Sequence, residues 1–112
     1  MKYDVAIIGA GPGGIFSAYE LTKLAPSLRV AVFEAGHSLE KRHCPIDGKK
    51  VKSCIGCKSC SIMSGFGGAG AFSDGKYNIT TAFGGWLTDF IDPATVMALI
   101  EYVDAINVGH GA

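Results

Sequence analysis

The sequence lacks a long apolar run and an excess of charge of either sign, and both absences limit its function. The longest apolar stretch near the N-terminus is Val5–Ile8, far below the roughly 20 residues that cross a membrane. Asp4 and the glycines that follow this stretch also differ from the apolar core of a secretory signal. Ten basic residues balance ten acidic ones, so no charged field favours nucleic acid. We therefore expect a cytoplasmic protein that binds neither nucleic acid nor membrane.

A catalytic signature is also missing. The histidines at 37, 43 and 110 belong to no nucleophile or triad pattern, and no other residue is a convincing general acid or base. The catalytic residues and the oligomeric state therefore stay unassigned. Glycine, in contrast, is abundant: it supplies 16 of 112 residues, about twice the usual share of roughly 7%. These glycines cluster, which indicates tight turns and close approach of the backbone to a neighbour.

The first third of the chain predicts an α/β fold. Tyr3–Ile8 and Leu28–Glu34 are short apolar runs typical of buried strands. Between them, Gly13–Leu24 repeats apolar residues at helical spacing until Ala25-Pro26-Ser27 interrupts the pattern. Strand, helix and strand in this order predict a Rossmann-like βαβ unit over residues 1–36, with parallel strands and a right-handed crossover.

The rest of the chain divides into an irregular segment and a glycine-rich loop with a helix. Residues 37–64 hold all four cysteines and show no long apolar period. Residues 65–112 begin with a glycine-rich loop, in which Tyr77–Thr81 predicts a short strand, and end in a helix. Asp92 suits the N-cap of that helix and Pro93 its first position. Its apolar stripe consists of Val96, Leu99, Ile100 and Val103. Two glycines, Gly109 and Gly111, end the helix.

Gly9-Ala10-Gly11-Pro12-Gly13-Gly14 is a G-x-G-x-x-G motif between the first predicted strand and the predicted helix. This context indicates a dinucleotide-binding loop rather than a chance glycine cluster. Gly9 permits the tight turn, Gly11 lets a pyrophosphate approach the backbone, and Gly14 lets the helix pack on the strand. The free N–H groups of the helix N-terminus, including the turn through Pro12 and Gly13, then face the phosphates.

Glu34 ends the second predicted strand and is followed by Ala35. A carboxylate at this place accepts hydrogen bonds from ribose hydroxyls and repels the additional phosphate of NADP. The alternative is a purely structural βα turn beside an unrelated surface glutamate.

The four cysteines allow three interpretations. Cys54, Cys57 and Cys60 have C-x2-C-x2-C spacing, and Cys44-Pro45 lies upstream. Bacterial ferredoxins use the same spacing with a Cys-Pro, although there the Cys-Pro comes last, so an iron–sulfur cluster is one interpretation. Zinc is the second, and free or redox-active thiols near Lys52 and Lys58 are the third. His43 is a spare ligand or an exposed side chain.

On these motifs the sequence resembles a known family. Residues 1–21 with VAVFEAG resemble the N-terminus of FAD-dependent oxidoreductases of the glutathione-reductase-like superfamily. GFGGAGAFSDGK, RHCP and CIGCKSCSIMSG are similar to segments of the FAD-utilising dehydrogenase family. Those proteins are several hundred residues long, so the resemblance implies that this chain is the N-terminal part of one FAD-binding domain.

The resemblance implies FAD as the cofactor, with the ADP half held by Gly9, Gly11, Gly14 and Glu34. It places Arg42 near the adenosine or the pyrophosphate, where the alternative is a solvated surface charge. It places residues 67–76 near the flavin, with a plain glycine turn as the alternative. Successive N–H groups in that segment would also form an anion nest. The residues concerned are Gly67, Gly68, Ala69, Gly70, Ser73, Asp74 and Lys76.

We therefore expect the FAD-binding portion of a flavin-dependent oxidoreductase that acts on a small-molecule redox substrate, with NAD(P)H as a candidate electron donor. Two alternatives stay open. One is a stand-alone NAD- or FAD-binding module without turnover, and the other is an iron–sulfur or thiol electron-transfer module.

Overall fold

The computed structural model describes residues 2–112. The chain divides into two compact units after Ser73, and the second is Asp74–Ala112. The first unit contains β1 (Val5–Ile8), α1 (Pro12–Leu24), β2 (Val30–Phe33) and two 3-10 helices, η1 (Leu39–Lys41) and η2 (Gly68–Phe72). The second contains α2 (Leu87–Phe90) and α3 (Pro93–Gly109). In the described residues, no helix is long and apolar enough to span a membrane.

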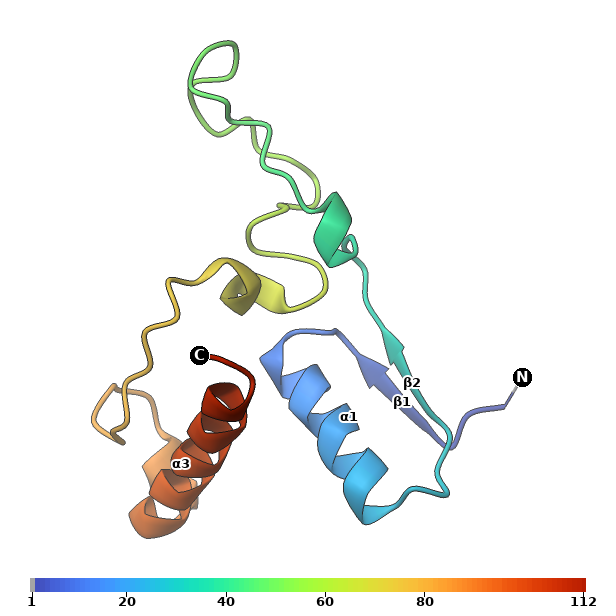
Figure 1. Cartoon of the computed structure of the whole chain (residues 1–112), viewed down its shortest axis with the longest axis vertical. Helices are drawn as coiled ribbons and strands as arrows, with labels where there is room; N and C mark the ends of the chain where they lie inside the picture. The colour runs from blue at the N-terminus through green and yellow to red at the C-terminus, as the bar shows by residue number, and fades with distance from the viewer. Residues whose placement is uncertain (1) are drawn as a thin grey trace. The chain divides into compact units, whose positions relative to one another are not determined.

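The βαβ unit is present as the sequence predicts (Figure 1). β1 and β2 pair in parallel, with Val5 opposite Val30 and Ile8 opposite Phe33. Both strands are shorter than the apolar runs that encode them, and α1 starts one residue earlier, at Pro12. Proline suits this first helical position because the N–H that it lacks would have no partner inside the helix.

Hydrogen bonds fix both ends of the strand pair. At one end, the Asp4 carboxylate accepts from Nε and Nη2 of Arg29, each at 3.0 Å, and from the Arg29 backbone N–H at 2.9 Å. At the other end, the N–H of Gly9 donates to the carbonyl of Phe33 at 2.7 Å. The second bond extends the pairing one residue beyond the strands. It therefore places the start of the glycine loop beside the end of β2.

The two-stranded sheet is only partly covered. Ile8 is 83% exposed and Phe33 51% exposed, although parallel strands are ordinarily buried on both faces. The described part of the first unit buries few side chains fully: Ala10 is its buried apolar residue, at 1% exposure, and Arg42 its buried charged residue, at 2%. Both belong to the region where the glycine loop meets the later glycine-rich segment. The best-packed part of this unit is therefore the contact between these two glycine-rich segments and not the sheet.

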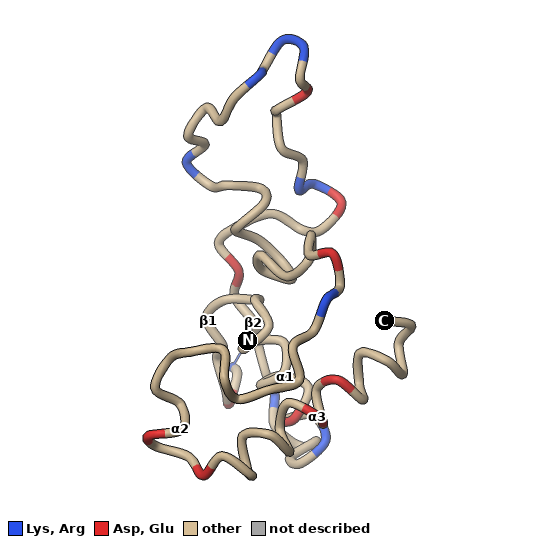
Figure 2. Tube along the Cα trace, turned by 90° about the vertical axis from the view of Figure 1, so that its left-hand side faces the viewer, with Lys and Arg blue, Asp and Glu red and all other residues tan. Residues whose placement is uncertain are grey.

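Residues 37–64 are irregular apart from η1, as predicted. At the tip of this loop, Oδ1 of Asp47 accepts from the N–H groups of Lys49, Lys50 and Val51, at 2.8, 2.8 and 2.9 Å. The resulting turn gathers basic residues, which Figure 2 shows in blue at the end of the loop.

The second unit confirms the predicted C-terminal helix and corrects one element. The Asp92 side chain accepts from the N–H of Thr95 at 3.0 Å, so it caps α3 as expected. The strand predicted at Tyr77–Thr81 is wrong: residues 77–81 are irregular. The Thr80 hydroxyl accepts from the N–H of Ala82 at 3.1 Å, a local bond of the kind that competes with strand pairing. Sequence patterns also missed the single-turn helix α2.

Candidate functional site

The glycine loop joins β1 to α1 in the conformation that the motif requires. Gly9 has φ +96°, in the left-handed region that glycine adopts without strain. A Cβ at Gly14 would overlap the carbonyl oxygen of Gly9, so only glycine lets α1 pack this closely on the end of β1. The N-cap of α1 is Gly11, and no side-chain hydrogen bond caps the helix there. The N–H groups of the first turn therefore stay available to an anion.

Glu34 is held by two backbone donors. Its Oε2 accepts from the N–H of Ala10 at 2.7 Å and its Oε1 from the N–H of Gly36 at 2.8 Å. The bond from Ala10, followed by that from Gly36, lowers the pKa of Glu34 below its usual range. The carboxylate is therefore ionised and oriented. Each oxygen has a further lone pair with which to accept from a ribose hydroxyl.

The second glycine-rich segment lies directly on the first glycine loop. The N–H of Gly67 donates to the carbonyl of Ala10 at 2.8 Å. A Cβ on Gly68 would come within 3.1 Å of the Cα of Gly11 and 3.2 Å of Cδ of Pro12. Both Gly67 and Gly68 have positive φ angles, of +86° and +59°. The structure thus brings together two glycine segments that are more than fifty residues apart in sequence.

Arg42 fixes this second segment from inside. Its Nη1 donates to the carbonyls of Phe66 and Gly68 at 2.7 and 2.8 Å, and its guanidinium stacks 4.7 Å from the ring centre of Phe72. Nε and Nη2 donate to the carbonyls of Ser61 and Ile62, at 2.8 and 2.7 Å. At 2% exposure, Arg42 is not the solvated surface charge that we considered as an alternative. Direct contact of Arg42 with a nucleotide stays a prediction.

A pair of glycines that the sequence analysis did not single out permits this arrangement. A Cβ on Gly36 would lie 2.6 Å from the Cα of Gly65, and one on Gly65 would lie 2.8 Å from Cδ of Arg42. The N–H of Phe66 also donates to the carbonyl of His37 at 3.0 Å. The position of Gly36, two residues after Glu34, could have indicated that it belongs to the site. No feature of a single sequence indicates that Gly65, almost thirty residues later, lies against it.

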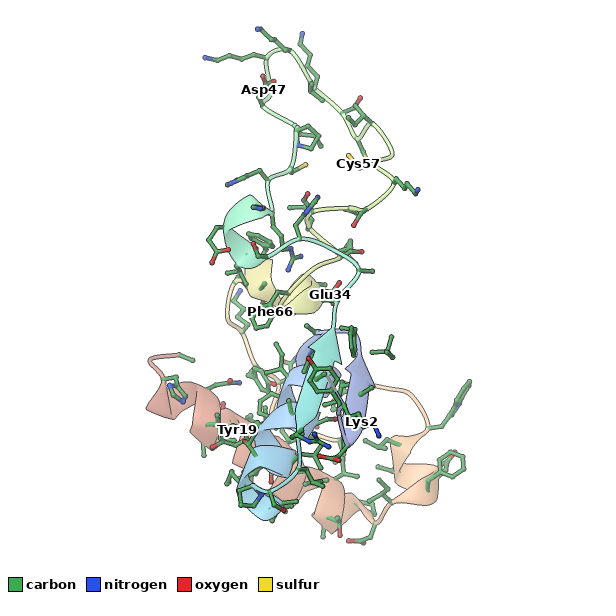
Figure 3. The ribbon with its side chains drawn as sticks, turned by 90° about the vertical axis from the view of Figure 1, so that its right-hand side faces the viewer. Lys2, Tyr19, Glu34, Asp47, Cys57 and Phe66 are labelled. Carbon is green, nitrogen blue, oxygen red and sulfur yellow. The ribbon has the colours of Figure 1, made fainter. Side chains whose placement is uncertain are left out.

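Two hollows flank the bend that follows β2, near Glu34 (labelled with Cys57 and Phe66 in Figure 3). One, of about 510 Å³, is mainly apolar and includes Leu39 and Phe66 in its lining. The other, of about 690 Å³, is more polar and includes Cys57, Lys58 and Ser59. Ala35 also lines the polar hollow, and its contact with a nucleotide stays a prediction. The sequence analysis predicted none of the three residues from the cysteine-rich segment as part of a nucleotide site.

The remaining predicted cofactor residues have less definite roles. Gly13 lies in the first turn of α1, and a Cβ added to it would meet no other atom within 4 Å. Ala69 and Gly70 belong to η2, and the N–H of Ser73 donates to the carbonyl of Gly70 at 3.1 Å. Asp74 belongs to the second unit, where it pairs with Lys76 at 3.6 Å. Their contact with a cofactor stays a prediction.

The cysteines are four free thiols. Cys44, Cys54 and Cys57 are exposed and Cys60 is half-buried. Within residues 2–112 no three His, Cys, Asp or Glu side chains gather as a metal site. Backbone N–H groups of Met63 and Ile62, with a smaller effect of Arg42, lower the pKa of Cys60. The iron–sulfur and zinc interpretations therefore stay predictions to which this arrangement adds no support.

Comparisons with known proteins agree with the βαβ unit. Residues 7–42 match the family model of an NAD(P)-binding Rossmann-like domain. An "Uncharacterized protein" of Clostridium beijerinckii is 32% identical over 113 aligned residues, covering 97% of this chain but 20% of that protein. The thiamine thiazole synthase of Thermotoga maritima is 59% identical over 34 residues, 30% of this chain and 13% of that protein. No solved structure gives a significant match.

This chain thus spans only a small part of the length of either curated relative, 20% of one and 13% of the other. The matched residues 7–42 include the glycine loop, Glu34 and Arg42. Together, the parallel strands, the uncapped helix N-terminus and this match show a Rossmann-like, dinucleotide-binding unit at the beginning of the chain.

Proposed function

We propose that this chain is the FAD-binding portion of a flavin-dependent oxidoreductase and holds the ADP half of FAD at the N-terminus of α1. One observation carries the proposal: the backbone of Gly68 lies against Gly11 at the uncapped end of that helix, beside the ionised Glu34. Glycine on both sides leaves no side chain between the backbone donors and a pyrophosphate. The first segment resembles FAD-dependent oxidoreductases of the glutathione-reductase-like superfamily and the second resembles FAD-utilising dehydrogenases, and both resemblances favour FAD over NAD.

The residues present fit the ADP half of FAD. A Cβ on Gly11 would meet only the Cα of Gly68, at 4.0 Å, so the space at the helix terminus is open. The N–H groups of the first turn and the helix dipole favour the negative pyrophosphate. Glu34 would accept from the ribose hydroxyls and disfavour the 2′-phosphate of NADP. When bound, the flavin would supply the redox chemistry; this chain would bind and orient it.

We further propose a cytoplasmic enzyme with a small-molecule redox substrate and NAD(P)H as the candidate electron donor, without nucleic acid or membrane as a partner. No residue of the chain is assigned as a general acid or base. The second candidate function is an NAD-binding module without turnover. It is favoured by the match of residues 7–42 to a domain described as NAD(P)-binding.

Gly11→Val tests the proposal. Gly11 has φ −75° and ψ −178°, which any residue adopts, so the fold is expected to persist while the added side chain fills the pyrophosphate position. We expect the purified protein to lose flavin and its affinity for ADP and FAD, measured by absorbance and calorimetry. The matched control is Gly109→Val, because Gly109 also has open space around it. Unchanged flavin content in Gly11→Val would contradict the proposal, and binding of NAD but not FAD would favour the second candidate.

A further inference from the structure

The polar hollow beside Glu34 is shared by two segments that are distant in sequence. It has a volume of about 690 Å³, within the range of small-molecule sites, about 300–1,000 Å³. One side is the bend after β2, residues 34–37. The other side is the part of the cysteine-rich loop that returns from its tip, residues 57–64. The lining residues that carry polar or reactive side chains are Glu34, His37, Cys57, Lys58, Ser59 and Ser64.

The chemistry of this lining matches an adenosine group. The carboxylate of Glu34 accepts from ribose hydroxyls, as both of its oxygens keep a lone pair after their bonds to Ala10 and Gly36. On the opposite limb, the ammonium of Lys58 and the hydroxyl of Ser59 are donors for ring nitrogens of adenine. The neighbouring hollow exposes mainly apolar surface and has Leu39 and Phe66 in its lining, so it offers the base an aromatic surface.

We propose that Cys57, Lys58 and Ser59 form the outer wall of the adenosine subsite, so that a bound nucleotide and a group attached to the Cys57 thiol exclude each other. This inference rests on the proposed function, because it requires Glu34 to hold the ribose. It gives the cysteine-rich segment a binding role that needs no metal. It also makes nucleotide affinity sensitive to covalent modification of Cys57, an exposed thiol.

The test uses the unaltered protein, with ADP as the nucleotide and N-ethylmaleimide as the thiol reagent. The thiolate of Cys57 adds across the carbon–carbon double bond of the maleimide, so no group leaves and no oxidant is needed. The modification rate of each cysteine is followed by mass spectrometry, with and without ADP. With ADP at ten times its Kd, we expect about tenfold slower modification of Cys57 by mass action. Cys44 and Cys54 are the internal controls, since both are exposed and neither lines the hollow.

The reciprocal measurement is the affinity of the modified protein for ADP, which we expect to fall at least about tenfold if one site cannot hold both groups. In Gly11→Val, ADP should give no protection because it no longer binds. If ADP binds and Gly11→Val abolishes that binding, but Cys57 reacts at the same rate with and without ADP, only this inference is overturned. If ADP does not bind the unaltered protein, the proposed function is overturned as well.

Discussion

The backbone N–H of Ala10 donates to Oε2 of Glu34 at 2.7 Å, which joins the loop after β1 to the residue after β2. This bond adds a side-chain link to the backbone pairing that ends at Gly9 and Phe33. It holds the carboxylate at the base of the glycine loop, next to the open N-terminus of α1. The acid that would bind ribose is therefore also a structural part of the loop that would bind pyrophosphate.

Glu34→Gln is expected to weaken binding of ADP and FAD. The amide keeps the size of the side chain but replaces a charged acceptor, and a hydrogen bond to a charged group is worth about 1.5–3 kcal/mol. Loss of one such bond corresponds to a fall in affinity of roughly 10- to 150-fold, measured by calorimetry. Glu101→Gln is the matched control, because Glu101 is exposed and belongs to α3 in the second unit. Equal effects of the two substitutions would contradict a ribose-binding role for Glu34.

The contribution of Glu34 to stability is expected to depend on pH in a defined direction. Its pKa is lowered in the folded chain, chiefly by the N–H of Ala10. The stabilisation is therefore fully present above the ordinary carboxyl pKa of about 4.3 and is lost as the pH falls through the lowered value. Urea unfolding of the wild type and of Glu34→Gln should show a stability difference that shrinks below about pH 4. Asp4 and Asp47 also have lowered pKa values, so only the difference between the two proteins isolates Glu34. A difference that is constant with pH would be inconsistent with this account.

Two adjacent glycines in α1 should respond to alanine in opposite ways. A Cβ at Gly14 would overlap the Gly9 carbonyl, whereas one at Gly13 meets nothing within 4 Å. Gly14→Ala should lower the free energy of unfolding by about 1–3 kcal/mol, as overpacking does. Gly13→Ala should raise it by roughly 0.5–1 kcal/mol, because alanine loses less backbone entropy in a helix. Chemical denaturation of both variants measures the contrast. Equal stabilities would show that α1 does not pack on β1 as described.

The local elements of the first unit could be predicted because each follows from a short sequence pattern. β1, α1 and β2 appear where apolar spacing, Pro12 and the interruption after Leu24 place them. Asp92 likewise caps α3 as its sequence position predicts. The residues 77–81 gave a wrong prediction because strand propensity needs a partner strand, and Thr80 forms a local turn instead.

The contacts between distant segments could not be predicted in the same way. Nothing in a single sequence indicates that Gly68 lies on Gly11, or that Gly36 and Gly65 approach each other. Arg42 shows most clearly what a single sequence cannot predict. The sequence allowed two interpretations of this residue, contact with the nucleotide or a solvated surface charge. The structure buries its guanidinium among backbone carbonyls, a position that depends on the conformation of a loop about twenty residues away.

Arg42→Met is expected to destabilise the first unit more than any exposed basic substitution. Removing the guanidinium leaves the carbonyls of Ser61, Ile62, Phe66 and Gly68 without the donor that each has at 2.7–2.8 Å. An unsatisfied buried acceptor costs about 1–3 kcal/mol, and water can reach some of these part-buried groups, so we expect a total loss of about 2–4 kcal/mol.

Arg42→Lys separates geometry from charge. Lysine keeps the positive charge but lacks the planar fork that serves several carbonyls at once, so this variant should also lose stability, by at least about 1 kcal/mol. Lys41→Met is the matched control, because Lys41 is the exposed neighbour and its loss should change stability by less than about 0.5 kcal/mol.

Hydrogen exchange at the N–H of Gly67 gives a local measurement, since that group donates to the carbonyl of Ala10 only while the segment is held in place. Faster exchange there in both Arg42 variants, and not in Lys41→Met, is the expected result. Wild-type stability in Arg42→Met would show that the four carbonyls do not depend on the guanidinium.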